Sequence, residues 1–127
     1  MTTDTMLWQP SPDRVARANI TAFARSVATR SGRSFPDYAS LWHWSNEERE
    51  VFWREVWDYA RVVGTRGDRT LVDGARMPGA RWFPDARMNF AENLLTRRAT
   101  GDGGDALVFR GEDKLVRRVS HAELAAT

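Results

Sequence analysis

Residues 80–95 read ARWFPDARMNFAENLL, in which two aromatic residues and a proline precede an apolar pattern that contains two asparagines. Two aromatic residues stand directly before Pro84, which is typical of an anchored turn. Apolar residues then recur at helical spacing, which predicts a helix over 89–98. Two asparagines, Asn89 and Asn93, lie within this apolar pattern, and their side-chain amides should need backbone partners. Such partners would explain a helix start or a pinned loop. The stretch therefore predicts a turn followed by a helix.

The segment upstream predicts a first helix that begins at Ser11 and ends near Gly32. A hydroxyl cap, a proline at the first helical position and an acid in the first turn mark its start. An apolar stripe at helical spacing runs along it and includes Val15, Phe23 and Val27. We expect this stripe to face a core.

Two further helices are expected before residue 60. A short one is predicted over 37–42, and a capping box from Ser45 to Glu48 predicts the start of another. The apolar face of that last helix is wide, so we expect it to pack against more than one neighbour. Its members are Phe52, Trp53, Val56, Trp57 and Tyr59.

The pattern changes after Gly64, where short strands replace long helices. A strand and turn are predicted at 70–74, and two strands at 106–109 and 115–119 form a hairpin. The run GDGGD at 101–105 predicts a linker rather than a phosphate-binding or calcium-binding loop, because it lacks the spacing of either motif. The fold class is therefore α+β, with a mainly helical N-terminal part followed by a short β-hairpin.

The last eight residues contain another capping box, from Ser120 to Glu123. This capping box predicts the start of a helix, but fewer residues follow it than the roughly 12–15 that an isolated helix needs. A single hairpin is also marginal without more sheet. We therefore expect the chain to be a fragment of a longer protein, with a helical extension over 1–104 and the start of a larger domain over 105–127.

Composition excludes several classes of protein. The 127 residues are 42% hydrophobic and include no cysteine, which favours a packed domain without disulfides or thiolate metal sites. No signal peptide or membrane span is present in the pattern, so a cytoplasmic protein without a membrane partner is expected. Nineteen basic residues, of which only Lys114 is a lysine, are interleaved with seventeen acids. Scattered arginines favour a solvated surface over a nucleic-acid site.

No catalytic, cofactor-binding or metal-binding residue emerges from the pattern. The two histidines, His43 and His121, have no spacing that joins them to a nucleophile or a metal pair. The tryptophans lie at helical spacing beside aliphatic residues, which favours core or interdomain contacts over base stacking. The chain alone is therefore expected to be inactive.

Five stretches carry a resemblance to a known family. They read LWQPSPDRVARANITAF at 7–23, FPDYASLWHWS at 35–45, FWREVWDY at 52–59, MPGARWFPDARMNFAENLL at 77–95 and DALVFRGED at 105–113. In this order the chain resembles the N-terminal region of the acetoacetate–CoA ligases, within the adenylate-forming acyl-CoA synthetase superfamily. The acetyl- and propionyl-CoA synthetases are similar in a wider sense.

The resemblance implies an enzyme that turns acetoacetate, ATP and coenzyme A into acetoacetyl-CoA, AMP and diphosphate through an acyl-adenylate. It implies a full-length α/β ligase fold that uses ATP, Mg²⁺ and coenzyme A, with 105–127 as the beginning of the large AMP-binding domain. None of the family's catalytic motifs falls within this chain. The partner implied is the missing catalytic domain of the same polypeptide. Side chains expected to pack against it are Trp53, Trp57, Trp82, Phe83, Asn89, Phe90 and Asn93.

Two alternatives to a ligase segment remain open. One is a stand-alone interaction module whose aromatic face binds a partner protein. The other is an Arg/Trp nucleic-acid binder, which would show salt-dependent binding to single strands. A natural stop codon at this point would favour the interaction module.

Overall fold

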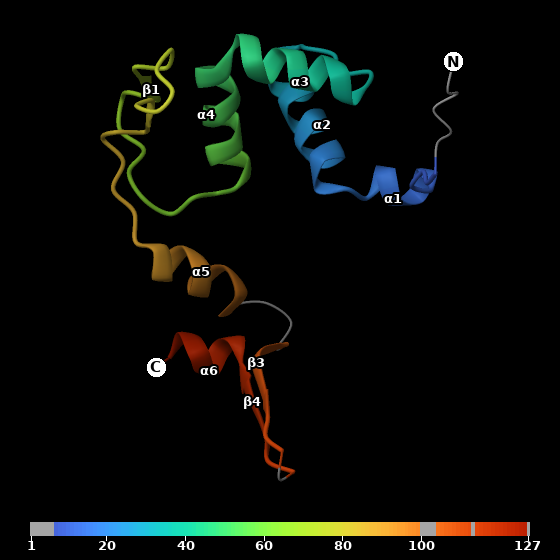
Figure 1. Ribbon diagram of the computed structural model, residues 1–127, viewed down its shortest axis with the longest axis vertical. Coiled ribbons are helices and arrows are strands. Elements are labelled where there is room, and N and C mark those ends of the chain that lie inside the picture. The colour runs from blue at the N-terminus through green and yellow to red at the C-terminus, as the bar shows by residue number, and fades with distance from the viewer. Residues whose placement is uncertain (1–6, 100–103, 113, 127) are drawn as a thin grey trace. The chain divides into compact units, whose positions relative to one another are not determined.

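The computed structural model describes residues 7–99, 104–112 and 114–126, with the side chains of 96–99 left aside. The chain divides into two compact units, Met1–Arg61 and Val62–Thr127, and each is described by itself. The first is helical, and the second combines helices with two small antiparallel sheets (Figure 1). This content agrees with the α+β class. The division into 1–104 and 105–127 stays a prediction.

The described residues of the N-terminal unit, from Leu7 onward, form four helices. They are α1 (Pro12–Ala16), α2 (Asn19–Ser31), α3 (Tyr38–Glu47) and α4 (Arg49–Tyr59).

The single helix predicted from Ser11 to Gly32 is wrong, because the structure breaks it into α1 and α2. Ser11 caps α1 as expected, with its Oγ accepting from the Arg14 N–H at 3.3 Å. Ala18 then takes an extended conformation, with ψ at 140°, and ends the first helical run. The Thr21 hydroxyl donates to the Val15 carbonyl at 2.6 Å, a bond across the break that a straight helix could not make.

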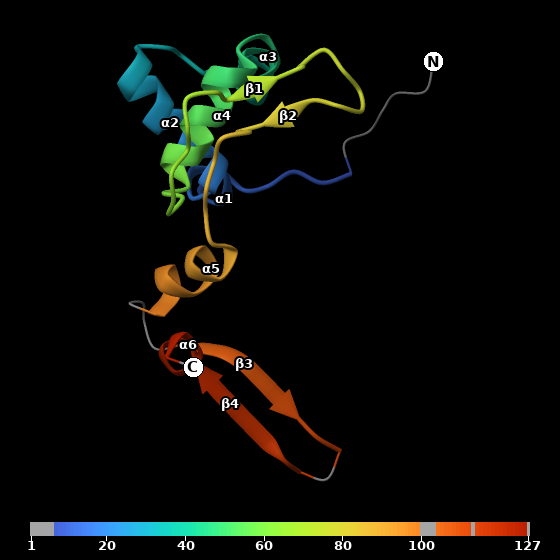
Figure 2. The same cartoon turned by 90° about the vertical axis from the view of Figure 1, so that its left-hand side faces the viewer.

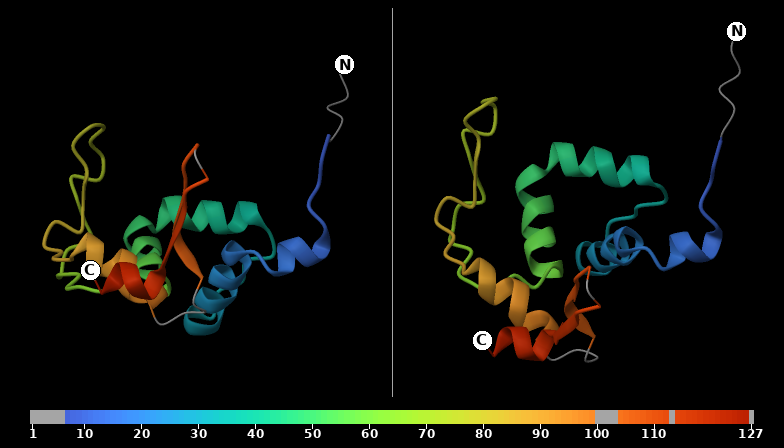
Figure 3. Two further views of the ribbon diagram at one scale, coloured as in Figure 1. Left: turned by 90° about the horizontal axis from the view of Figure 1, so that it is seen from below. Right: turned by 60° about the horizontal axis from the view of Figure 1, so that its bottom comes forward.

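The boundary predicted between the next two helices is also wrong. Asp37 and Ser40 form the capping box of α3, and the helix continues five residues past the predicted end at residue 42. Ser45 starts no helix: its hydroxyl bonds back to the Trp42 carbonyl at 2.7 Å, inside α3. The corner falls at Glu48, where α3 meets α4 at a sharp turn (Figure 3).

The core of the N-terminal unit lies among α2, α3 and α4. Its buried members are Phe23, Val27, Leu41 and Trp44. Packed against them are Ala24, Phe35, Phe52, Val56 and Tyr59. Phe23 meets Phe52 and Tyr59 edge to face, with ring centroids 5.7 and 5.3 Å apart, the geometry that aromatic quadrupoles favour. The expected apolar stripe therefore does face the core at Phe23 and Val27, whereas Val15 stays exposed.

In the part of the C-terminal unit that the structure describes, there are four strands and two helices. They are β1 (Leu71–Val72), β2 (Arg81–Trp82), α5 (Phe90–Ala99), β3 (Asp105–Arg110), β4 (Val116–Ser120) and α6 (His121–Ala125).

Each strand of this unit pairs with one antiparallel neighbour (Figure 2). The predicted strand at 70–72 and the predicted hairpin are confirmed. Strand β2 is an addition, because Trp82 was expected in an anchored turn with Phe83 and Pro84. The predicted helix over 89–98 corresponds to α5. Most of the predicted linker at 101–105 lies outside the described residues, which resume at Gly104.

The capping box that the sequence predicts at Ser120 is confirmed at the start of α6. The Ser120 hydroxyl accepts from the Glu123 N–H at 3.2 Å, and the Glu123 carboxylate accepts from the Ser120 N–H at 2.7 Å. The backbone N–H and the hydroxyl of Ser120 both donate to this carboxylate, which favours its ionised form and lowers the pKa of Glu123. The start of α6 is therefore set by the side chains of Ser120 and Glu123.

Candidate docking surfaces

The diagnostic stretch at 80–95 forms one arm of an extended antiparallel pairing, whose other arm is residues 63–72. The paired arms meet at Leu71 with Trp82 and at Val72 with Arg81. Closer to the open end, Thr65 and Arg87 exchange two backbone hydrogen bonds of 2.8 Å. The stretch is therefore built around backbone pairing.

An ion pair joins the two arms between these backbone contacts. Arg69 donates from Nε and Nη2 to the two carboxylate oxygens of Asp85, at 2.8 and 2.5 Å. These hydrogen bonds favour the ionised carboxylate and hold the pKa of Asp85 below its usual range. The geometry is bidentate, which fixes the relative position of the arms as well as contributing energy.

Two glycines let the arms approach closely. A Cβ on Gly64 would lie 2.5 Å from the Arg87 carbonyl oxygen, and one on Gly67 would lie 2.5 Å from the Asp85 Cβ. Gly67 also has φ of 76°, a conformation that most side chains disfavour. Any larger residue at either position would therefore force the arms apart.

Asn93 closes the pairing at its open end. Its Oδ1 accepts from the Val63 N–H and its Nδ2 donates to the Val63 carbonyl, both at 2.8 Å. Asn89 stands before α5, where its Oδ1 accepts from the Glu92 N–H at 3.3 Å. Both asparagines thus have the backbone partners that their apolar setting predicted, one in a pinned loop and one at a helix start.

The aromatic pair of the stretch lies where the arms join β1 and β2. Phe83 has φ of 44°, and its N–H donates to the carbonyl of the buried Thr70 at 2.8 Å. A bulky residue in this region of backbone space is strained and persists only where surrounding contacts fix it. Phe83 is half-buried, whereas the neighbouring Trp82 is exposed.

The remaining residues expected to pack against another domain also keep surface open to solvent. Trp53 on α4 is 40% exposed and Phe90 at the start of α5 is 76% exposed, while Trp57 is half-buried. Trp53 and Trp57 belong to the N-terminal unit and the other five to the C-terminal unit. Their role in interdomain packing stays a prediction, and the structure supplies surface that such packing could cover.

The β3–β4 hairpin of the C-terminal unit exposes apolar side chains on both of its faces. One face and the adjoining α6 line a groove of about 490 Å³. Its lining residues are Leu107, Phe109, Leu115, Arg117, Val119 and Leu124. The opposite face carries Val108 and Val116, which are 57% and 48% exposed. Among the described residues of this unit no apolar side chain is fully buried, so its apolar surface is open to contact with another protein segment.

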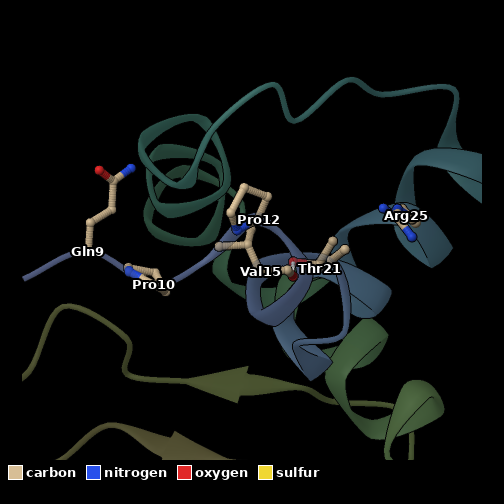
Figure 4. A pocket seen from close by; sticks show the side chains of 7 residues that line it. Gln9, Pro10, Pro12, Val15, Thr21 and Arg25 are labelled. Atoms are coloured by element: carbon tan, nitrogen blue, oxygen red, sulfur yellow. Dashed lines mark hydrogen bonds between the residues drawn. The ribbon is translucent and has the colours of Figure 1, made fainter.

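A second hollow lies in the N-terminal unit, where the segment before α1 meets α1 and α2 (Figure 4). It measures about 580 Å³ and is lined by Gln9, Pro10, Pro12, Val15, Ala16, Thr21 and Arg25. Figure 4 shows Gln9 and Arg25 at opposite ends of the hollow. Nearby, the Arg14 guanidinium lies 5.8 Å from the centre of the Trp8 ring. The described residues that line the hollow include one cation and no paired acid and base, so they form a shallow binding surface rather than a reaction centre.

The chemistry available in the described part of the chain is limited. No group of three or more His, Asp or Glu side chains there could hold a metal ion. His43 is exposed with its ring against Trp42, and the His121 N–H donates to the Gly104 carbonyl. The two histidines belong to different units. None of the helices described is long and apolar enough to cross a membrane.

Sequence reasoning missed the Arg69–Asp85 pair and strand β2. The sequence does place Arg69 and Asp85 on opposite sides of the turn at 73–80, and this position is the signal from which their pairing could have been predicted. Once Leu71 is paired with Trp82, antiparallel register brings position 69 close to position 85. That register could not be read without knowing the turn.

Comparison with known proteins places residues 38–94 in the family described as the acetyl-coenzyme A synthetase N-terminus. The chain is 50% identical to the acetoacetyl-coenzyme A synthetase of Rhizobium meliloti (strain 1021) over 120 residues, which are 94% of this chain and 18% of that protein. It is 30% identical to the acetoacetyl-CoA synthetase of Rattus norvegicus over 121 residues, again 94% and 18%. It is 39% identical to the malonamoyl-CoA synthetase vrtB of Penicillium aethiopicum over 92 residues, or 71% and 12%. No solved structure matches.

The matched family range runs from the start of α3 into α5 and includes both paired arms. The chain is therefore similar to the N-terminal segments of acyl-CoA synthetases. Within that class, the relatives from Rhizobium meliloti and Rattus norvegicus carry the name acetoacetyl-CoA synthetase, the kind that the resemblance in the sequence implied. The chain spans 18% of the length of its Rhizobium meliloti relative.

Proposed function

We propose that this chain is the N-terminal packing segment of an ATP-dependent acetoacetate–CoA ligase. In that enzyme acetoacetate and ATP form an acyl-adenylate and diphosphate, and coenzyme A then takes the acyl group and releases AMP. The observation that supports this most strongly is the 50% identity to an acetoacetyl-coenzyme A synthetase over 94% of the chain. ATP, Mg²⁺ and coenzyme A would be bound by the larger part of the enzyme, and the location would be cytoplasmic.

The contribution of this segment is structural in the proposal. The seven side chains expected at an interdomain contact (Trp53, Trp57, Trp82, Phe83, Asn89, Phe90 and Asn93) lie on α4 and on the arm that leads into α5. Full burial of a large apolar side chain contributes about 1.5–3 kcal/mol. Phe90, at 76% exposed, has the most to gain from such a cover. The asparagines would act earlier, by holding the arm in the shape that presents Phe90.

The substrate proposed is a short carboxylate with a second carbonyl group two carbons away. Acetoacetyl and malonamoyl groups, which appear in the names of the relatives, share this arrangement. Acetoacetate is the choice for this chain because several similar proteins carry that name, including those of Rhizobium meliloti and Rattus norvegicus. Acetate or propionate would be the substrate if the chain came instead from the acetyl-/propionyl-CoA synthetase branch.

The test is to read the coding sequence on both sides of these 127 codons and to express the polypeptide it encodes. AMP release is then measured with coenzyme A and each of acetoacetate, malonamate, acetate and propionate. We expect AMP release to depend on acetoacetate. Preference for acetate or propionate would move the chain to the other branch. An encoded protein of 127 residues that binds a partner without releasing AMP would favour the interaction module.

A further inference from the structure

The β3–β4 hairpin has two backbone edges that differ in their residues. The Gly111 N–H donates to the Leu115 carbonyl at 2.7 Å, so this pair is hydrogen-bonded. Hydrogen-bonded and non-hydrogen-bonded pairs alternate along an antiparallel ladder. Phe109 with Arg117 is then the next bonded pair, and Val108 with Arg118 lies between bonded pairs.

This alternation decides which backbone groups point outward. The N–H and C=O groups of Val108 and Arg110 point away from β4, along the outer edge of β3. The corresponding groups of Val116 and Arg118 point away from β3, along the outer edge of β4. Each edge therefore offers a row of donors and acceptors that a further strand could meet.

The side chains distinguish the two edges. Residues 106–109 of β3 form an unbroken apolar run, the pattern of a strand covered on both faces inside a sheet. In β4 the neighbours Arg117 and Arg118 interrupt the apolar pattern. Charged side chains are typical of strands at the edge of a sheet, where they discourage further pairing. The sequence of β3 suits an inner strand and that of β4 suits an edge strand.

The exposure of the β3 side chains agrees with a strand that has β4 on one side and, among the described residues, no strand on its outer edge. Leu107, Val108 and Phe109 are 53%, 57% and 57% exposed, although they alternate between two faces. Leu107 and Phe109 line the groove beside α6, and Val108 lies on the opposite face. A two-stranded hairpin is marginally stable in water, so a third strand would stabilise it.

We propose that the outer edge of β3 is a strand-addition site. Its occupant is an extended segment with alternating apolar side chains from the remaining part of the same CoA synthetase polypeptide. This rests on the proposed function. The matched segment is 18% of the Rhizobium meliloti relative, so the other 82% (100 − 18) is available to supply the strand. A segment of the same polypeptide also has a high effective concentration at the edge.

The binding experiment uses this 127-residue chain and the Rhizobium meliloti polypeptide without its 120-residue matching segment. Two matched variants are compared, Val108→Pro on the β3 edge and Val116→Pro on the β4 edge. Both positions are exposed valines on the same face, and the N–H that proline removes points outward in each case. We expect Val108→Pro to weaken binding about tenfold or more, and Val116→Pro to change it by about twofold or less.

Amide hydrogen exchange locates the added strand in the unaltered chain. On binding, exchange at Val108 and Arg110 should slow by about tenfold or more, while Val116 and Arg118 keep their rates. In Val108→Pro, retained protection of the Phe109 and Arg117 amides shows that the hairpin is intact. This exchange measurement is independent of whether a proline variant folds.

Three results would overturn the proposal. They are protection at Val116 and Arg118 instead of β3, absence of binding by the unaltered chain, and self-association through β3 that persists with the Rhizobium meliloti polypeptide in excess. The proposed function is judged separately, by AMP release. Acetoacetate-dependent AMP release together with protection on β4 would keep the function and reject the β3 edge.

Discussion

Replacing Asn93 by leucine should free the open end of the paired arms. The asparagine amide makes two hydrogen bonds of 2.8 Å to the backbone of Val63, one as acceptor and one as donor. Leucine has a similar volume and can make neither bond. Each such bond contributes about 0.5–1.5 kcal/mol net, so the local opening free energy should fall by about 1–3 kcal/mol.

The assay for this change is amide hydrogen exchange at Val63. Since about 1.4 kcal/mol is a factor of ten, exchange at Val63 should accelerate by roughly 5-fold to 150-fold. Asn93→Asp is an informative second variant, because the acceptor of the Val63 N–H remains while the donor to its carbonyl is lost. Its acceleration should therefore be smaller.

Asn89→Ala serves as the matched control, since it removes the α5 cap and leaves the side-chain bonds between Asn93 and Val63 in place. Exchange at Val63 should stay within about threefold of the unaltered chain in this variant. The reasoning is refuted if Asn93→Leu leaves Val63 exchange unchanged, or if Asn89→Ala accelerates it as much. Either result would mean that something other than this amide holds the arms together.

Three more outcomes follow from other contacts. Because pairing with Arg69 lowers the pKa of Asp85, the ion pair stabilises the arms above the ordinary aspartate pKa of about 4, and this stabilisation is lost as pH falls through the lower pKa of the folded state. Opening of the arms, followed by NMR chemical shifts, should therefore increase in acid. The Asp85→Asn variant should abolish that pH dependence. Ser120→Ala should destabilise α6 by about 0.5–2 kcal/mol, seen as faster exchange at Ala126 and restored in large part by Ser120→Thr. The purified chain should bind a hydrophobic dye and melt without a sharp transition, and Phe109→Lys should lower the dye signal; a sharp, cooperative transition with low dye binding would contradict this.

Local signals in the sequence predicted the start of several elements. Ser11 and Ser120 cap helices where expected, because a cap depends on the three residues that follow it. Ser45 shows the limit of the same signal. It satisfies the capping-box pattern with Glu48, yet α3 continues through it while the adjacent Trp44 packs into the core. Tertiary packing overrode a valid local cap.

The candidate surfaces were harder to foresee because they depend on register between distant residues. Asn93 could be predicted to need a backbone partner, but nothing local identified Val63, which lies thirty positions away. The hairpin at 106–119 was predictable from turn and strand patterns, while its two unlike edges became visible only with the pairing of residues 108 and 118. Periodicity predicts faces, and register decides which groups meet.

The paired arms also bear on how such segments can change during evolution. The contacts of Val63, Thr65 and Arg69 with the other arm all depend on the same pairing register between the arms. A single residue inserted within either arm would displace several of these contacts at once, whereas an insertion in the turn at 73–80 would displace none. Length differences among homologous segments should therefore gather at that turn. The tip of that turn is exposed, with Met77 97% accessible, so added length there would extend into solvent.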